Sequence, residues 1–177
     1  MFILLLVVVS VSLIARPKTP FEWEQARAEA RNPRWVSVEI TTADNRREYH
    51  QGDPILVSAR FSSAMRERYK IEVAEGWSLS AVDLLHLSDG QQVPLNRTFI
   101  ICCDSRLIGL SDEPYSPRTL TPLRLAPGNY EIYLTSMRVF PWEAGPKEYD
   151  ASSFQVASNL LKIRVVPDAS KVSGNPR

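Results

Sequence analysis

The sequence has 177 residues and 44% hydrophobic content, which indicate one globular domain with extensions. Its 21 basic and 20 acidic residues leave a net charge of +1 and are interspersed along the chain. Because nucleic-acid-binding proteins concentrate Lys and Arg on one face, this distribution argues against nucleic acid as a partner. Thirteen prolines favour strands and loops over long helices.

The first segment, residues 1–15, carries no charged side chain and is almost wholly apolar. A membrane-spanning helix needs ~20 apolar residues, whereas the core of a signal peptide needs ~7–15. The length favours a signal peptide cleaved after the small residue Ala15. The lack of a preceding Lys or Arg, and the charge of Arg16, leave a retained membrane anchor open. Both alternatives predict an extracytoplasmic protein, periplasmic or secreted, that touches a membrane only through this segment.

The next segment, residues 16–33, is predicted to be a linker that contains a short helix. Thr19 and Glu22 form a capping-box pattern, with Pro20 between them at the first helical position. Good helix formers follow as far as Arg31, after which Asn32-Pro33 ends the pattern. The apolar side of this helix is thin, so the helix either packs on the domain or acts as a spacer.

From residue 34 to residue 167 the apolar residues recur with period two, which is typical of half-buried strands. Asp89-Gly90 predicts a hairpin in which both turn residues take positive φ. The polar, proline-spaced residues 104–122 predict a long connection, and the tail 168–177 is expected to be disordered. Strands are predicted at residues 36–40, 47–50, 55–61, 69–73, 81–87, 92–95, 98–103, 130–136 and 160–166.

One stretch carries a more specific structural signal. Pro127 and Gly128 form a turn signal, and Tyr130 opens a new alternating strand. This pattern is similar to the tyrosine corner of Greek-key sandwiches, in which the Tyr hydroxyl bonds to backbone a few residues upstream. We therefore assign structural roles to Pro127, Gly128 and Tyr130.

Short strands separated by turn signals predict an all-β fold rather than βαβ units. The motifs Gly-Asp-Pro-Ile, Asp-Gly, Leu-Ala-Pro-Gly-Asn-Tyr and Ser-Asn-Leu-Leu-Lys-Ile-Arg-Val follow one another along residues 34–167. In this order they resemble uncharacterised bacterial immunoglobulin-like domains of exported proteins. The resemblance implies an immunoglobulin-like Greek-key β-sandwich of 7–9 strands, preceded by an N-terminal apolar helix and the short linker helix.

The residues that most often carry catalysis or metal binding are few. His50 and His86 are the two histidines of the sequence, and no Gly-x-Ser-x-Gly motif accompanies them. Cys102 and Cys103 are adjacent, so they favour neither a cross-sheet disulfide nor a shared zinc ion. They remain candidates for buried thiols, a strained vicinal pair or an intermolecular link. The sequence predicts no catalytic residue, no metal site and no cofactor.

The most distinctive surface candidate is the segment from residue 137 to residue 149, predicted to be an end loop. Its aromatic residues Phe140, Trp142 and Tyr149 are candidate anchors for a protein partner, because aromatic side chains dominate interface hot spots. The competing interpretation is that Phe140 and Trp142 cover the open end of the core.

These observations predict a non-catalytic exported binding or assembly module of the cell envelope, with a protein partner. One alternative is a protease-inhibitor-like module that acts through the loop 137–153. The other is an enzyme whose carboxylates converge only in the folded chain.

Overall fold

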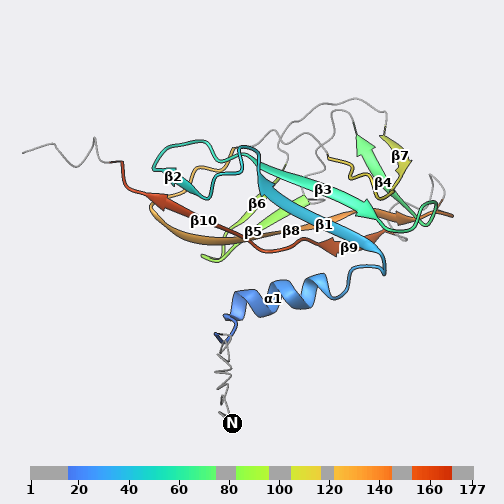
Figure 1. The fold of residues 1–177 in the computed structure, drawn as a ribbon, viewed down its shortest axis with the longest axis horizontal. Helices are drawn as coiled ribbons and strands as arrows, with labels where there is room; N and C mark the ends of the chain where they lie inside the picture. Colours follow the sequence, from blue (N-terminus) through green and yellow to red (C-terminus); the bar gives the residue numbers. More distant parts are fainter. Residues whose placement is uncertain (1–15, 75–82, 96–104, 117–121, 145–152, 169–177) are drawn as a thin grey trace, which may run out of the picture.

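The computed structural model describes residues 16–74, 83–95, 105–116, 122–144 and 153–168. These residues are mostly β-structure with one short helix, which confirms the predicted all-β class (Figure 1). Two of the described strands pair in a small sheet, and eight belong to a large sheet. The elements are α1 (Pro20–Glu29), β1 (Val36–Thr42), β2 (Glu48–His50), β3 (Val57–Ser63), β4 (Tyr69–Ala74), β5 (Asp83–Leu87), β6 (Gln92–Pro94), β7 (Ser105–Gly109), β8 (Gly128–Pro141), β9 (Phe154–Ala157) and β10 (Leu161–Val166).

The small sheet consists of β1 and β3, which pair antiparallel. Val38 lies opposite Phe61, and both side chains are buried. Between the buried positions, Glu39 and Arg60 lie opposite each other and are exposed. The period-two pattern of the sequence thus separates an inner apolar face from an outer polar face.

The large sheet is organised around β8, a strand of 14 residues. One edge of β8 pairs first with β10 and then with β9, and its other edge pairs first with β5 and then with β4. The register shifts between Ser136 and Val139, where β8 changes its neighbour from β5 to β4 while β9 pairs on both sides of the shift. The short strand β2 pairs in parallel with β10.

The inner faces of the two sheets enclose one hydrophobic core. Ile40 and Phe61 of the small sheet meet side chains of β8 and β10 such as Ile132 and Leu161, all of which are fully buried. Burial of each such side chain contributes about 1.5–3 kcal/mol before entropy is counted. The apolar alternation in the sequence is therefore what joins the two sheets.

Helix α1 packs against the outer face of the large sheet, so the molecule has three layers (Figure 1). The capping box is present as predicted: Glu22 N donates to Thr19 Oγ1 at 3.1 Å, and Thr19 N donates to Glu22 Oε2 at 2.8 Å. The helix ends at Glu29 rather than at Arg31. Of the two alternatives for this helix, packing on the domain is the one observed.

No helix among the described residues has the length and apolar character required to cross a membrane.

The predicted long connection at residues 104–122 is wrong in part. Strand β7 lies inside it and pairs antiparallel with β4. Further along, Tyr115 bridges Phe61, and Leu123 bridges Ile55 next to the small sheet. The two bridges are single residue pairs, and β7 has five residues. Both are too short to give a clear period-two alternation of apolar residues in a sequence rich in Pro and Ser.

The predicted end loop that starts at residue 137 is also wrong in its first part, because β8 continues through Pro141. Arg138, Val139 and Phe140 are buried in succession, while Met137 is exposed. The register shift after Ser136 interrupts the alternation of buried and exposed residues that marks a strand. The strand predicted from the sequence therefore ended at residue 136, too early. Strand β9, which pairs with this part of β8, was also not predicted.

The predicted hairpin at Asp89-Gly90 joins β5 to β6. Gly90 N donates to Leu87 O, Leu87 N donates to Gln91 O, and both distances are 2.9 Å. Gly90 has a φ of +88°, but Asp89 is not among the residues with positive φ. One left-handed residue instead of two makes this a longer hairpin loop with a glycine bulge. The hairpin is therefore confirmed, with a different turn type.

Several predictions concern residues outside the described ranges. They are the apolar segment 1–15, the buried strand at 98–103 with Cys102 and Cys103, the anchor Tyr149, and the tail from residue 169 onward.

Candidate functional site

A groove runs between α1 and the outer face of the large sheet, with a volume of about 320 Å³. One wall comes from α1 and the floor comes from three neighbouring strands, β5, β8 and β9. The lining residues are Glu24, Arg27, Ala28 and Arg31 from the helix segment, His86, Tyr133 and Thr135 from β5 and β8, and Gln155, Val156 and Ala157 from β9.

The floor of the groove is built around an aromatic pair. His86 and Tyr133 lie opposite each other in the β5–β8 ladder, and their rings stack at 4.6 Å with an interplanar angle of 6°. His86 Nε2 lies 2.8 Å from Thr135 Oγ1, within hydrogen-bonding distance. These side chains point outward because Leu85 and Leu134, their neighbours in sequence, point into the core.

Burial shifts the pKa of each of these two rings in the direction that favours its neutral form. Burial lowers the pKa of His86 below its usual value, against an opposing effect of the Glu24 carboxylate, so the imidazole is neutral at pH 7. Burial, together with the hydrogen bond to Glu24, raises the pKa of Tyr133 well above its usual range. The Tyr133 hydroxyl is therefore protonated, and it donates to Glu24 Oε1 at 2.7 Å.

The groove wall on the helix side carries two cationic side chains, Arg27 in the last turn of α1 and Arg31 just after its C-terminal end. Both residues are exposed. Within the part of the chain that the structure describes, no acidic side chain forms an ion pair with either of them. The groove thus combines a polar floor with a wall that carries two arginines and the Glu24 carboxylate, an arrangement suited to binding polar groups.

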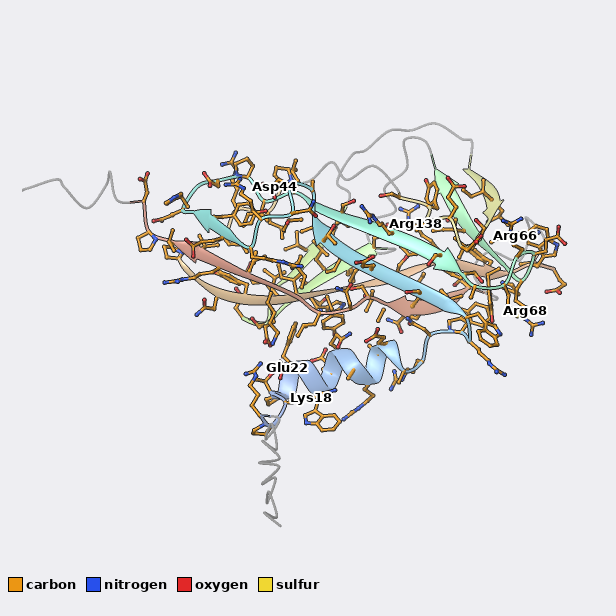
Figure 2. The ribbon with its side chains drawn as sticks, in the orientation of Figure 1. Lys18, Glu22, Asp44, Arg66, Arg68 and Arg138 are labelled. Carbon is orange, nitrogen blue, oxygen red and sulfur yellow. The ribbon has the colours of Figure 1, made fainter. Side chains whose placement is uncertain are left out.

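At its N-terminal end, α1 is held on the sheet by a cluster of charged residues. Lys162 Nζ of β10 lies 2.6 Å from Glu22 Oε1 and 2.8 Å from Glu131 Oε1. Arg16 Nη2 also contacts Glu22 Oε1 at 2.6 Å. The hydrogen bond from Lys162, followed by that from the Thr19 backbone, lowers the pKa of Glu22 to about 2. Glu22 lies at the start of α1 in Figure 2. Because Glu22 stays ionised, its carboxylate is arranged for ion pairing rather than for proton transfer.

Along the body of the helix segment, side-chain amides bond to the strand backbone. Gln25 Nε2 donates to Ser158 O at 2.6 Å, and Gln25 is buried. Asn32 Nδ2 donates to Ala157 O, while Ala157 N donates to Asn32 Oδ1, each at 2.7 Å. Asn32 therefore supplies one donor and one acceptor, as a neighbouring strand would.

Two of the predicted anchor residues lie at the other end of the sheet. Phe140 is 2% exposed and lies opposite Lys70 in the β8–β4 ladder. Trp142 is half-buried: Lys70 Nζ lies 5.0 Å from its ring centroid, and a Cβ at Gly109 would come within 2.9 Å of the ring. This packing matches the interpretation in which the two aromatics cover the end of the core. It leaves Phe140 no surface to offer a partner, and it does not supply the exposed aromatic pair that would favour a binding module or an inhibitor-like module acting through this segment.

The predicted tyrosine corner has a well-defined geometry. The Tyr130 hydroxyl donates to Ala126 O, four residues upstream, at 3.0 Å. A Cβ at Gly128 would lie 3.4 Å from the Tyr130 ring, an ordinary van der Waals distance, so the ring packs directly over this position of the turn. Pro127 is exposed between the acceptor and that glycine.

The groove was not predicted from the sequence. In the sequence, His86 is a histidine without an accompanying catalytic motif. Its partners come from distant parts of the chain: Glu24 lies on the helix and Tyr133 on β8. No local motif could signal this. His50, the other histidine, is exposed at the end of β2, and its backbone N donates to Asp53 Oδ2 at 3.0 Å.

Among the described residues, no three His, Cys, Asp or Glu side chains form a group that could hold a metal ion. Comparison with protein-family models, with curated proteins and with solved structures finds no match to this chain.

Proposed function

We propose that this chain is an exported, non-catalytic binding or assembly module of the cell envelope, and that the groove between α1 and the large sheet is its contact site. The observation that carries the proposal is the construction of that groove. Its floor is a hydrogen-bonded polar surface, and its wall presents Arg27 and Arg31 without ion-pair partners among the described residues.

The chemistry of the groove supports binding more than catalysis. His86 is neutral and hydrogen-bonded to Thr135, and the Tyr133 hydroxyl is held protonated by burial and by Glu24. A general base needs a carboxylate or another group that orients its imidazole toward a reacting atom. A neutral imidazole and a phenol fixed against one another offer stacking and hydrogen bonding to a ligand instead.

For the fold we propose an immunoglobulin-like Greek-key sandwich. Two facing sheets around one core and the Tyr130 hydrogen bond to Ala126 support it. The additional helix layer on the large sheet extends this architecture. For the location we propose the periplasm or the exterior, because residues 1–15 form an uncharged apolar sequence of signal-peptide length.

The proposal is tested by site-specific photo-crosslinking of the full chain in the cells that produce it. A photoreactive residue replaces Gln155, which is exposed at the groove floor. The matched control replaces Glu39, which is exposed on the outer face of the small sheet. We expect a discrete crosslinked product from position 155 and none from position 39. Equal products from both positions, or none from position 155, would overturn the assignment of the groove.

A further inference from the structure

The acidic and basic side chains of α1 and of the segment just before it differ in their partners. Each of the three acidic side chains within α1 accepts a hydrogen bond from another group of the protein: Glu22 from Lys162, Glu24 from Tyr133 and Glu29 from Gln25. The cationic side chains Lys18 and Arg27 are exposed and, among the described residues, form no ion pair. Each carboxylate of the helix thus has a hydrogen-bond partner, although Glu24 and Glu29 are exposed and bond to neutral donors. Lys18 and Arg27 have no ion-pair partner among the described residues.

The same exposed side carries a large aromatic residue. Trp23 is 58% exposed, the most exposed of the large hydrophobic side chains in the described residues. It lies two residues from Phe21 and two from Gln25, which both contact the sheet, so helical geometry places Trp23 on the opposite side. Lys18 Nζ lies 5.2 Å from the centre of the Trp23 ring, and Arg27 follows one turn later on the helix.

We infer that the outward side of α1, formed by Lys18 and Trp23 and bounded by Arg27 at the rim of the groove, lies on an anionic lipid bilayer surface. Tryptophan is enriched at the membrane–water interface, where its ring reaches the acyl boundary while its N–H remains hydrated. Lys and Arg close to an anionic leaflet each add a favourable electrostatic contribution. The pattern of one aromatic flanked by two unpaired cations is complementary to such a surface.

The sequence before the helix indicates that the partner of this surface is a membrane. Residues 1–15 are uncharged and apolar, and only Arg16–Thr19 separate them from the start of α1. Four residues span at most about 14 Å, so a membrane that takes up the apolar segment lies within reach of α1. Lys18 lies at this end of α1 in Figure 2. The inference rests on the alternative in which residues 1–15 are retained as a membrane anchor. It extends the membrane contact from that segment to the folded domain, and it does not depend on the ligand of the groove.

The test uses the full chain reconstituted in vesicles that contain brominated phosphatidylglycerol, with brominated phosphatidylcholine for comparison. Bromine quenches tryptophan fluorescence at short range. We expect quenching in phosphatidylglycerol, and we expect the Trp23→Phe variant to lose most of it. Trp142→Phe is the matched control, because Trp142 packs on Gly109 at the β4–β7–β8 end of the large sheet, and it should retain the quenching.

Charge reversal separates the electrostatic contribution from simple tethering. The double variant Lys18→Glu, Arg27→Glu should reduce the quenching in phosphatidylglycerol vesicles and leave the weaker signal in phosphatidylcholine unchanged. If the chain floats with the vesicles but Trp23→Phe retains the quenching, the apolar segment is the sole attachment and the inference is wrong. Failure of the chain to float with anionic vesicles would also overturn it.

Discussion

The large sheet is covered on its inner face by apolar side chains of the small sheet and on its outer face by polar side chains of α1. Between the sheets, residues such as Ile40, Phe61 and Leu161 are fully buried in one cluster. Under the helix, the attachments are the Lys162 ion pairs, the Gln25 bond to Ser158 and the two bonds of Asn32 to Ala157. Phe21, whose ring lies 5.3 Å from that of Tyr133, is the main aromatic contact of the helix.

The inter-sheet core and the attachment of α1 should therefore be weakened by different solution conditions. Apolar burial depends little on pH or salt, whereas exposed ion pairs are screened by salt and lost when a partner is neutralised. The sandwich should therefore remain folded under conditions in which α1 separates from it. Because α1 forms one wall of the groove, opening of the helix would also dismantle the proposed contact site.

The largest effect is expected from Phe61→Ala in the inter-sheet core. Phe61 has no exposed surface and packs between the sheets. Its truncation leaves a cavity and should reduce the free energy of unfolding by about 3–5 kcal/mol. Urea denaturation followed by circular dichroism measures this loss. A change below about 1 kcal/mol would contradict the view that this core joins the sheets.

A smaller effect is expected from Asn32→Ala, which removes both side-chain bonds to Ala157. Ala157 is 2% exposed, so its backbone N–H and C=O would be left without partners. The expected loss is about 1–3 kcal/mol, measured by the same denaturation. The matched control is Arg31→Ala, one residue away and without an ion pair in the described structure. Equal losses in the two variants would mean that Asn32 contributes no specific bond.

The smallest effect is expected from the pH dependence of the Glu22 ion pairs. The pKa of Glu22 is lowered from 4.5 to about 2, so its stabilising contribution is fully present above pH 4.5 and lost as the pH falls toward 2. The pKa of Lys162 is raised, chiefly by its hydrogen bonds to Glu131 and Glu22, so its contribution persists through neutral pH. The pH window for this loss therefore lies between 4.5 and about 2.

The measurement is the difference in Tm between the wild type and Glu22→Gln across this window. We expect the difference to be largest at neutral pH and to vanish near pH 2. Glu39→Gln is the control, because the Glu39 side chain is exposed on β1 and has no partner among the described residues. A Tm difference that does not change with pH would remove Glu22 from the attachment of α1.

Sequence patterns predicted the apolar part of this molecule better than the polar part. Val38 and Ile40 alternate with polar residues because a strand with one buried face requires it, and β1 follows directly from that pattern. The capping box of Thr19 and Glu22 likewise marked the start of α1. Both signals are local and depend on one element alone.

The parts that could not be predicted depend on pairings between distant residues. Strand β8 changes its neighbours at a bulge, and the successive burial of Arg138, Val139 and Phe140 there does not resemble a strand in sequence. The groove requires Glu24 to meet Tyr133, 109 positions apart. Polar side chains that bond across such separations leave no period in the sequence.

Native-state hydrogen exchange in low concentrations of denaturant tests the central comparison most directly. If mainly polar contacts hold α1, its amides should exchange through a local opening that has a lower free energy than β8 and little dependence on denaturant. The amides of β8 should exchange only through global unfolding, with the full denaturant dependence. Identical free energies and denaturant dependences for α1 and β8 would show one cooperative unit and would contradict this account.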